Sequence, residues 1–427
     1  MQLSGEYTTM EKLKIYGGRR LEGRIQVQGA KNSVLPILAG AILVRGESLL
    51  QNCPDLKDVA AAISILRHLG CVVTRQGSNV HIDSTILTRS DIPDELMREM
   101  RSSVIFLGAI LGRMGEATLS MPGGCELGPR PIDLHLKALC TLGAELEENG
   151  GNIICRGGRL VGAEITLASP SVGATENAML AAVCAEGETV ITNAAREPEI
   201  VDLARFLETS GARIQGAGQS TITIEGGGMG RPVVHRVMPD RIVASTYLSA
   251  VAMAGGRVEL LDIVPEHIET VVIALRAAGC EITVSGQNLE IQSSGRLSAI
   301  SPVITRPYPG FPTDAQPCLL AACTKARGTT VFIENIFESR YRYVEELGRM
   351  GARIRLEGRV AVVTGVDRLV GAQVVATDLR GGAALVVAAL GAEGETQIGE
   401  LAHIDRGYDR FEETLRELGA DVDRVVI

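Results

Sequence analysis

Residues 159–189 read RLVGAEITLASPSVGATENAMLAAVCAEGET, and residues 368–396 read RLVGAQVVATDLRGGAALVVAALGAEGET. The two stretches match from end to end once two residues are deleted from the first, which indicates a duplication. Within the first, residues 177–184 form an apolar run rich in Ala and Leu, which is typical of a short buried helix. A Gly-containing turn and a β-branched run at 189–192 follow, so we expect a strand after the helix.

A shorter signature recurs through the whole chain: a Leu lies four residues before a Gly that is followed by Ala or Cys. The copies are Leu66/Gly70/Cys71, Leu139/Gly143/Ala144, Leu207/Gly211/Ala212, Leu275/Gly279/Cys280, Leu347/Gly351/Ala352 and Leu415/Gly419/Ala420. Successive glycines are 68 to 73 residues apart, so the chain consists of six units of about 70 residues.

The residues before each repeated Gly predict a second helix in the unit. In unit three, Ile200, Leu203 and Leu207 fall at helical spacing, and a left-handed Gly at the end would stop the helix. A hairpin of residues 212–214 with 221–224 completes this unit.

The helices predicted first in each unit have no polar face, as residues 178–183 illustrate, so we expect them to be buried inside sheets. A chain of 427 residues exceeds what one core usually holds. The sequence therefore predicts an α/β protein of two domains of roughly 200 residues, each with three units and with a cleft where they face each other.

Composition limits the functional classes. The formal net charge of −9 and the low aromatic content of 3% disfavour a nucleic-acid-binding protein. No apolar run is long enough to span a membrane, so no membrane partner is expected. The nine Cys show no CxxC spacing and no His at zinc-ligand distance, which favours a reducing compartment, the cytoplasm, and predicts no metal site. Most of them lie in apolar runs and are expected to be inert core thiols, including Cys140, Cys155, Cys184 and Cys323.

Basic residues recur where the unit pattern places helix beginnings and loops after strands. These residues are Lys31, Arg101, Arg130, Arg340, Arg380 and Arg406. A helix start favours an anion through its backbone N–H groups and dipole, and a nearby cation strengthens that preference. We therefore expect an anionic small substrate. The alternative is that they are ordinary surface charges among the 42 Lys and Arg residues.

The loop PGGCELGPRPIDLH, residues 122–135, contains Cys125 among glycines, with too little apolar surface nearby to bury its sulfur. Arg130 and a predicted helix start would lower the pKa of this thiol from about 8.5 toward neutrality. Such a thiol can act as a nucleophile or a proton donor. The alternative is a loop cysteine without a role.

Nine motifs occur in one order along the chain. They are GAKNSVLP (29–36), MRSSV (100–104), PGGC (122–125), SVGATEN (171–177), REPEIVD (196–202), FPTD (311–314), FESR (337–340), ATDLR (376–380) and HIDRGY (403–408). In these motifs the chain resembles the UDP-N-acetylglucosamine 1-carboxyvinyltransferases, enolpyruvyl transferases of the EPT/RTPC-like superfamily that begin bacterial peptidoglycan synthesis. The resemblance runs from about residue 10 to residue 426.

The resemblance implies two inverse α/β barrel domains of three repeats each, with the active site in the cleft between them. Residues 10–30 plus 239–427 would form the C-terminal domain. Residues 31–238 would form the N-terminal domain, which carries the Cys loop at about 118–130.

The resemblance also implies a reaction: transfer of the enolpyruvyl group of phosphoenolpyruvate to the 3-hydroxyl of UDP-N-acetylglucosamine, with release of phosphate and without a cofactor. Cys125 would donate a proton to C-3 of phosphoenolpyruvate and would be alkylated by the epoxide fosfomycin. Asp314 would be the base near the sugar hydroxyl, although an Asp after Pro312 and Thr313 is also typical of a helix cap.

Further residues take binding roles by resemblance. Those for phosphoenolpyruvate are Lys31, Asn32, Arg130, Arg340, Arg380 and Arg406, of which Lys31 and Arg406 would also be catalytic. Those for UDP-N-acetylglucosamine are Arg101, Arg130, Pro131, Ile132, Asp133, Leu134, Ser171, Val172, Gly173, Asp314, Ile336 and Phe337.

One position departs from the family pattern. Some members have a Lys two residues before the Ser of SVG, where this chain has Ser169, so the diphosphate would rely on backbone N–H groups or on another cation. Three alternatives remain: the shikimate-specific relative, disfavoured by the PGGC loop; a paralogue that binds the nucleotide sugar without turnover; and an RNA-end-processing enzyme of similar repeats, disfavoured by the acidic charge.

Overall fold

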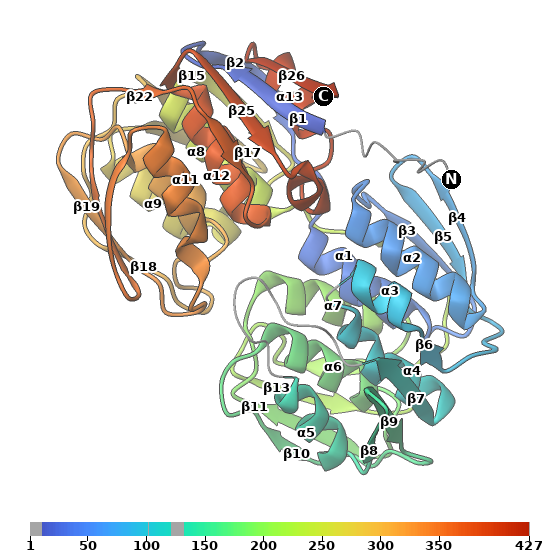
Figure 1. The fold of residues 1–427 in the computed structure, drawn as a ribbon. Coiled ribbons are helices and arrows are strands. Elements are labelled where there is room, and N and C mark those ends of the chain that lie inside the picture. The colour runs from blue at the N-terminus through green and yellow to red at the C-terminus, as the bar shows by residue number, and fades with distance from the viewer. Residues whose placement is uncertain (1–10, 101, 121–131, 427) are drawn as a thin grey trace, which may run out of the picture. The chain divides into compact units, whose positions relative to one another are not determined.

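The computed structural model describes residues 11–100, 102–120 and 132–426 (Figure 1). These residues divide into two compact units. The N-terminal unit comprises residues 28–240 and 307–309, and the C-terminal unit comprises residues 11–27, 241–306 and 310–426. Each unit has its own cluster of buried apolar side chains.

In the described part of the N-terminal unit, the strands form sheets of four. The first sheet has the order β14 (Val233–Arg236), β3 (Glu47–Gln51), β5 (Asn79–Asp83), β4 (Val72–Gln76). The second has the order β6 (Asp91–Ile92), β7 (Glu116–Ser120), β9 (Asn152–Arg156), β8 (Glu145–Asn149). The third has the order β10 (Glu164–Thr166), β11 (Glu188–Thr192), β13 (Thr221–Glu225), β12 (Arg213–Gln215).

The C-terminal unit repeats this arrangement. Its first sheet has the order β2 (Leu21–Gln26), β15 (Gly256–Leu261), β17 (Asn288–Ser293), β16 (Glu281–Ser285). The second has the order β18 (Val303–Ile304), β19 (Thr329–Ile333), β21 (Val360–Thr364), β20 (Arg353–Glu357). The third has the order β23 (Gln373–Val375), β25 (Glu395–Gly399), β1 (Glu11–Tyr16), β26 (Asp421–Val426). A small parallel pair, β22 (Leu369–Val370) with β24 (Ala392–Glu393), lies outside these sheets.

All six of these four-stranded sheets, counted over the described residues, share one pairing pattern. The first two strands in each order are parallel, and the other neighbours are antiparallel. The hairpin predicted in unit three is confirmed to within one residue as β12 and β13. The pattern supports six copies of one structural unit.

Helices connect the strands. Those of the N-terminal unit are α1 (Lys31–Ala41), α2 (Lys57–Leu69), α3 (Asp94–Glu99), η1 (Ser103–Ile105), α4 (Phe106–Met114), α5 (Asp133–Thr141), α6 (Val172–Ala182) and α7 (Pro198–Thr209). Those of the C-terminal unit are α8 (Arg241–Ala254), η2 (Pro265–Ile268), α9 (Glu269–Ala277), α10 (Gln316–Cys323), η3 (Arg340–Tyr343), α11 (Val344–Arg349), α12 (Leu379–Leu390), η4 (Leu401–Arg406) and α13 (Phe411–Glu417).

The repeated Leu–Gly signature is a helix stop. Each of the six glycines has a φ between +89° and +114°, which confirms the predicted left-handed conformation. After each Gly, the backbone N–H of the Ala or Cys donates to the carbonyl of the signature Leu at 3.0–3.1 Å. This is the Schellman arrangement, in which a residue without a Cβ turns the chain and satisfies a terminal helix carbonyl. The signature Leu is fully buried in all six units.

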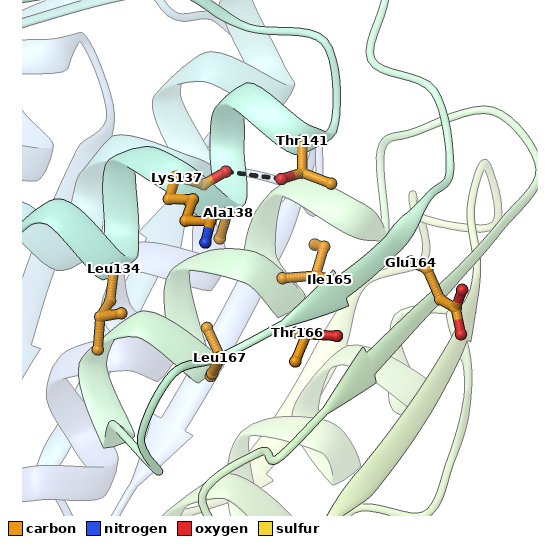
Figure 2. Close-up of a pocket in the computed structure, with 8 residues that line it drawn as sticks. All are labelled: Leu134, Lys137, Ala138, Thr141, Glu164, Ile165, Thr166 and Leu167. Carbon is orange, nitrogen blue, oxygen red and sulfur yellow. Dashed lines mark hydrogen bonds between the residues drawn. The ribbon is translucent and has the colours of Figure 1, made fainter.

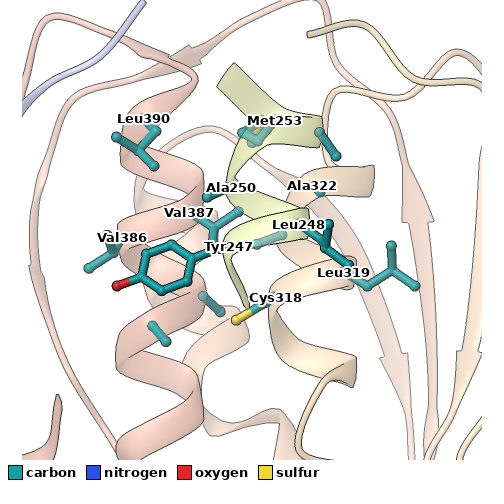
Figure 3. Close-up of a cluster of buried hydrophobic side chains, with 14 of the residues drawn as sticks. Tyr247, Leu248, Ala250, Met253, Cys318, Leu319, Ala322, Val386, Val387 and Leu390 are labelled. Atoms are coloured by element: carbon teal, nitrogen blue, oxygen red, sulfur yellow. The ribbon is translucent and has the colours of Figure 1, made fainter. Parts of the chain in front are cut away.

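The first helix of each unit is buried, as its composition predicts. In the C-terminal unit, α8, α10 and α12 pack against one another, and Figure 3 shows Leu248, Cys318, Leu319 and Val387 among the side chains where they meet. Every residue of α10 and every residue of α12 after Leu379 is buried. No helix in the described ranges is both long and apolar enough to cross a membrane.

Candidate functional site

Lys31 is the first residue of α1, and its ammonium is held by a buried carboxylate. The residue is only 8% exposed. Its Nζ lies 2.7 Å from Oδ2 of Asp58, which is in the first turn of α2 and is 1% exposed. A buried charge is tolerated when it is paired in this way. Asn32, the next residue, is half-buried.

A distant segment of the chain supports the start of α1. The residue before the helix, Ala30, makes no side-chain cap. Instead, Asp240 accepts a hydrogen bond from the backbone N–H of Lys31 at 3.1 Å, and Met238 accepts one from the backbone N–H of Ala30 at 2.7 Å. Asp240 therefore satisfies a donor that the first turn of a helix otherwise leaves unpaired.

Asp202 of α7 also binds residues at this turn. Its carboxylate accepts hydrogen bonds from the hydroxyl of Ser33 and, at 3.2 Å, from the backbone N–H of Met238. Nε2 of His235 lies 3.1 Å from its other oxygen. Asp202 is 4% exposed and Ser33 is fully buried. The turn that presents Lys31 and Asn32 is thus held by carboxylates from distant parts of the unit.

Ser171 caps α6, which confirms that residues 171–173 begin a helix. The Ser171 hydroxyl accepts a hydrogen bond from the backbone N–H of Ala174 at 3.3 Å. The helix starts at Val172, five residues before the apolar run at 177–184. A helix start of this kind offers backbone N–H groups to an anion.

His135 of α5 packs beneath this helix start. Nδ2 of Asn177, in α6, lies 2.7 Å from Nδ1 of His135. A Cβ added to Gly173 would lie 2.9 Å from Cε1 of His135. Burial lowers the pKa of His135 to about 4, although the nearby Asp133 acts in the opposite direction. His135 is therefore neutral near pH 7 and adds no charge to this part of the unit.

A hollow of about 220 Å³ lies between α5 and β10 (Figure 2). Leu134, Lys137, Ala138 and Thr141 line it on the helix side, and residues 164–167 line it on the strand side. Figure 2 shows the Lys137 ammonium turned toward the hollow. Leu134, one of the residues expected at the nucleotide, therefore borders a real depression. Its neighbours at the start of α5, Ile132 and Asp133, are half-buried and exposed, respectively.

In the C-terminal unit, Asp314 lies against two buried guanidinium groups. Its Oδ1 is 2.6 Å from Nη2 of Arg340, and its Oδ2 is 3.4 Å from Nη2 of Arg380. Arg340 is 1% exposed and Arg380 is 3% exposed, whereas the Asp314 side chain is 26% exposed. The N-cap position of α10 is Ala315 and not Asp314, and the Asp314 carboxylate forms ion pairs with both guanidinium groups. A carboxylate with an accessible edge and cations behind it can accept a proton from a bound hydroxyl.

Asp378 is the residue that caps a helix here. Its Oδ1 accepts hydrogen bonds from the backbone N–H groups of Arg380 and Gly381, both at 3.0 Å, at the start of α12. The first turn of α12 has no room for side chains at its glycines, because a Cβ at Gly381 would lie 2.9 Å from Cβ of Tyr343, in η3. A Cβ at Gly382 would lie 2.7 Å from Cγ1 of Ile404, in η4. These glycines let η3 and η4 approach α12 closely.

That close approach brings the remaining basic residues to α12. Arg340 is the first residue of η3, and Arg406 is the last residue of η4 and is half-buried. Arg380 also donates to the hydroxyl of Tyr408 at 3.3 Å, and burial raises the pKa of that hydroxyl, so Tyr408 stays neutral. The C-terminal unit thus gathers Arg340, Arg380 and Arg406 around the start of one helix.

Ile336 and Phe337 lie in the turn after β19. Their backbone N–H groups donate to Oε1 of Glu334 at 2.8 and 3.0 Å. Ile336 is 38% exposed, and the Arg340 guanidinium lies 4.8 Å from the centre of the Phe337 ring. The turn therefore presents one exposed apolar side chain beside the Asp314 ion pair.

Arg101, Cys125, Arg130 and Pro131 lie outside the described residues. One prediction about thiols is wrong: Cys140 is exposed, because α5 buries His135, Ala138 and Leu139 on its other face. Cys155 and Cys323 are buried, as expected, and Cys184 is partly so.

The sequence interpretation missed five buried acidic residues that hold either the candidate site residues or the turns that carry them. These are Asp58, Asp202, Asp240, Glu334 and Asp378. Only Asp378, which lies just before an apolar helix, has a sequence signal that identifies its capping role. The others are single acids whose burial depends on contacts between distant parts of the chain.

Comparisons with known proteins agree on one family. The EPSP synthase (3-phosphoshikimate 1-carboxyvinyltransferase) family matches residues 15–415. The chain is similar to UDP-N-acetylglucosamine 1-carboxyvinyltransferase 2 of Caldanaerobacter subterraneus subsp. tengcongensis, with 51% identity over 98% of this chain and 100% of the relative. It is also similar to UDP-N-acetylglucosamine 1-carboxyvinyltransferase 1 of Symbiobacterium thermophilum, with 49% identity over 97% of this chain and 95% of the relative.

The fold agrees with these similarities. The crystal structure of the enolpyruvyl transferase NikO from Streptomyces tendae superposes with a TM-score of 0.87 and 26% identity, over 98% of this chain and 100% of that one. The mixed α/β architecture is therefore that of enolpyruvyl transferases. With full-length relatives near 50% identity, the chain belongs to the UDP-N-acetylglucosamine 1-carboxyvinyltransferases, within the EPSP synthase family.

Proposed function

We propose that this protein transfers the enolpyruvyl group of phosphoenolpyruvate to the 3-hydroxyl of UDP-N-acetylglucosamine and releases phosphate, the first committed step of peptidoglycan synthesis. The observation that carries the proposal is the identity of 49–51% with relatives named for this activity, over 97–98% of the chain. The Asp314 ion pair supports it, because the reaction needs a base beside a hydroxyl.

The proposed chemistry is addition followed by elimination. In the addition, the sugar oxygen bonds to C-2 of phosphoenolpyruvate, an acid protonates C-3, and a base takes the hydroxyl proton. In the elimination, the bond from C-2 to the phosphate oxygen breaks, phosphate leaves with the electron pair, and C-3 loses a proton. We propose Cys125 as the acid and Asp314 as the base.

We propose that five basic residues and one Asn bind phosphoenolpyruvate and that the basic ones stabilise its phosphate as it leaves. The basic residues are Lys31, Arg130, Arg340, Arg380 and Arg406, and the Asn is Asn32. Preorganised cations suit this role because they need little reorganisation as charge moves onto the phosphate. The buried carboxylates support this reading, since Asp58 and Asp378 hold Lys31 and the start of α12 in fixed positions.

For the nucleotide sugar, we propose two contact regions in the N-terminal unit and one in the C-terminal unit. Arg101 and residues 130–134 would contact the uridine, and the hollow beside Leu134 supports this. Ser171, Val172 and Gly173 would contact the diphosphate at the start of α6. Asp314, Ile336 and Phe337 would contact the sugar.

At the level of architecture, we propose two inverse α/β barrels of three repeats each, formed by residues 31–238 and by 10–30 plus 239–427. The active site would lie in the cleft between them. The shared strand order of the sheets supports the repeats. The distribution of the proposed residues over both units, with Lys31 in one and Asp314 in the other, supports a shared site.

Fosfomycin is expected to alkylate Cys125, because an activated thiolate opens an epoxide. Cys140 is the internal control: it is exposed, but partial burial raises the pKa of its thiol, so it should stay unmodified near pH 7. Peptide mass spectrometry after treatment should find the added mass on Cys125 alone. Modification of Cys140, or of no cysteine, would argue against an activated thiol at Cys125.

The activity itself is tested by measuring phosphate release from phosphoenolpyruvate with and without UDP-N-acetylglucosamine. Release that depends on the nucleotide sugar is expected. Shikimate 3-phosphate in its place should give no release. If the nucleotide sugar binds in calorimetry but no phosphate is released, the chain is a binding protein and the proposal fails.

A further inference from the structure

Glu334 is a buried acid to which the reaction described above gives no role. It directly follows β19 and is 1% exposed. Its Oε1 accepts the backbone N–H groups of Ile336 and Phe337, and its Oε2 accepts the hydroxyl of Thr313 at 3.0 Å. One carboxylate thus holds the turn after β19 and the residue next to Asp314.

Thr313 connects this acid to the ion pair. Its hydroxyl oxygen accepts a hydrogen bond from Nε of Arg340 at 3.1 Å, while its proton is donated to Glu334. Arg340 in turn donates from Nη2 to Oδ1 of Asp314 at 2.6 Å. Since a hydroxyl has a single proton, donation to Glu334 leaves a lone pair of Thr313 for Arg340.

The Arg340 guanidinium is therefore fixed from several directions. Thr313 binds Nε, Asp314 binds Nη2, and Asp378 lies 4.0 Å from Nη1. The ring of Phe337, whose backbone Glu334 holds, lies against the same guanidinium at 4.8 Å. A planar group held at its edge and over its face has little freedom to rotate, and neither has the carboxylate that it binds.

We propose that Glu334 is a positioning residue that orients Asp314 through Thr313 and Arg340. It also fixes the turn of Ile336 and Phe337 relative to that carboxylate. The inference rests on the proposed function, in which Asp314 takes the proton of the sugar hydroxyl. Glu334 acts on Asp314 only by way of Thr313 and Arg340, so its contribution is to geometry and not to proton transfer.

The sharpest test compares Thr313→Val with Thr313→Ser. Val keeps the shape of Thr but removes the hydroxyl, whereas Ser keeps the hydroxyl. We expect Thr313→Val to lower kcat by about 10- to 100-fold, the loss typical of a misplaced reacting group. KM for UDP-N-acetylglucosamine should stay within about threefold, since Ile336 and Phe337 remain bound to Glu334. Thr313→Ser should retain kcat close to the wild-type value.

A second variant, Glu334→Gln, tests the acid itself. Its amide oxygen can still accept the N–H groups of Ile336 and Phe337, but its NH₂ group would donate to Thr313 and reverse that hydrogen bond. We expect a loss of kcat similar to that of Thr313→Val. The double variant should lose little more than either single variant, because both break one path.

The outcomes separate the possibilities. A wild-type kcat in Thr313→Val, an equal loss in Thr313→Ser, or multiplicative losses in the double variant would overturn the positioning role of Glu334. A fall in the thermal midpoint without a change in kcat would show a purely structural role and would overturn it too. A wild-type protein that releases no phosphate would instead overturn the proposed function, and this inference with it.

Discussion

Replacing Asp314 by Asn is expected to lower kcat by about 10²- to 10⁴-fold, the usual contribution of a positioned general base. Asn has the size of Asp, and its amide oxygen can still accept from Nη2 of Arg340, which lies 2.6 Å from Oδ1. An amide cannot take the hydroxyl proton at neutral pH. Phosphate release at saturating substrate measures the loss, and calorimetry should show that UDP-N-acetylglucosamine still binds.

Asp367→Asn is the matched control for this variant. Asp367 also pairs with an arginine of the same unit, Arg296 at 2.9 Å, but its side chain is 99% exposed. An exposed ion pair of this kind contributes little to stability. Its kcat should equal the wild-type value. If Asp314→Asn kept kcat within about twofold, Asp314 would be a structural partner of Arg340 and Arg380 and not the base.

Replacing Lys31 by Met is the second change with a large expected effect. Met retains most of the length of Lys but removes the charge proposed to bind phosphoenolpyruvate, so turnover should fall by more than about 10²-fold. The variant should also be less stable. Asp58, which is 1% exposed, loses the ammonium that lies 2.7 Å from it, and removing one partner of a buried ion pair costs about 3–5 kcal/mol.

The double variant Lys31→Met with Asp58→Asn separates these two effects. It removes both charges, so no buried carboxylate loses its cation, and the thermal midpoint should recover most of the loss. Turnover should not recover, because the ammonium is still missing. If activity returned together with stability, the role of Lys31 would be structural, and the proposed contact with phosphoenolpyruvate would be wrong.

The repeated units could be predicted because each carries its own local signal. The Leu–Gly signature specifies a helix stop, and the six glycines have the expected left-handed conformation. The apolar run in residues 178–183 correctly predicts a helix without a solvent face. These features depend on residues close together in sequence, which periodicity and turn chemistry describe well.

The way the sheets are completed could not be predicted from local spacing. β1, near the start of the chain, pairs with both β25 and β26, near its end (Figure 1). β2 likewise pairs with β15, and β14 with β3. The hydrophobic periodicity of a strand does not indicate which strand it pairs with when the two are more than 180 residues apart. The resemblance to a known family, not the spacing, indicated that residues 10–30 join the C-terminal half.

In the candidate site, too, local sequence signals identify some residues, whereas others depend on contacts between distant parts of the chain. Basic residues such as Lys31 and Arg380 stand out in sequence because they recur at helix starts. The partners of Lys31, Asp58 and Asp240, do not, since nothing local distinguishes a buried acid from an exposed one. Cys140 illustrates the opposite error: it lies in an apolar run, but only one face of a nine-residue helix is buried.

The addition–elimination account is tested most directly by running the reaction in D₂O. If C-3 of phosphoenolpyruvate is protonated to a methyl group and then loses a proton, solvent deuterium must enter that carbon. The account predicts an enolpyruvyl product with deuterium in its terminal methylene group, detected by NMR. A product formed in D₂O with only protium at that carbon would contradict it.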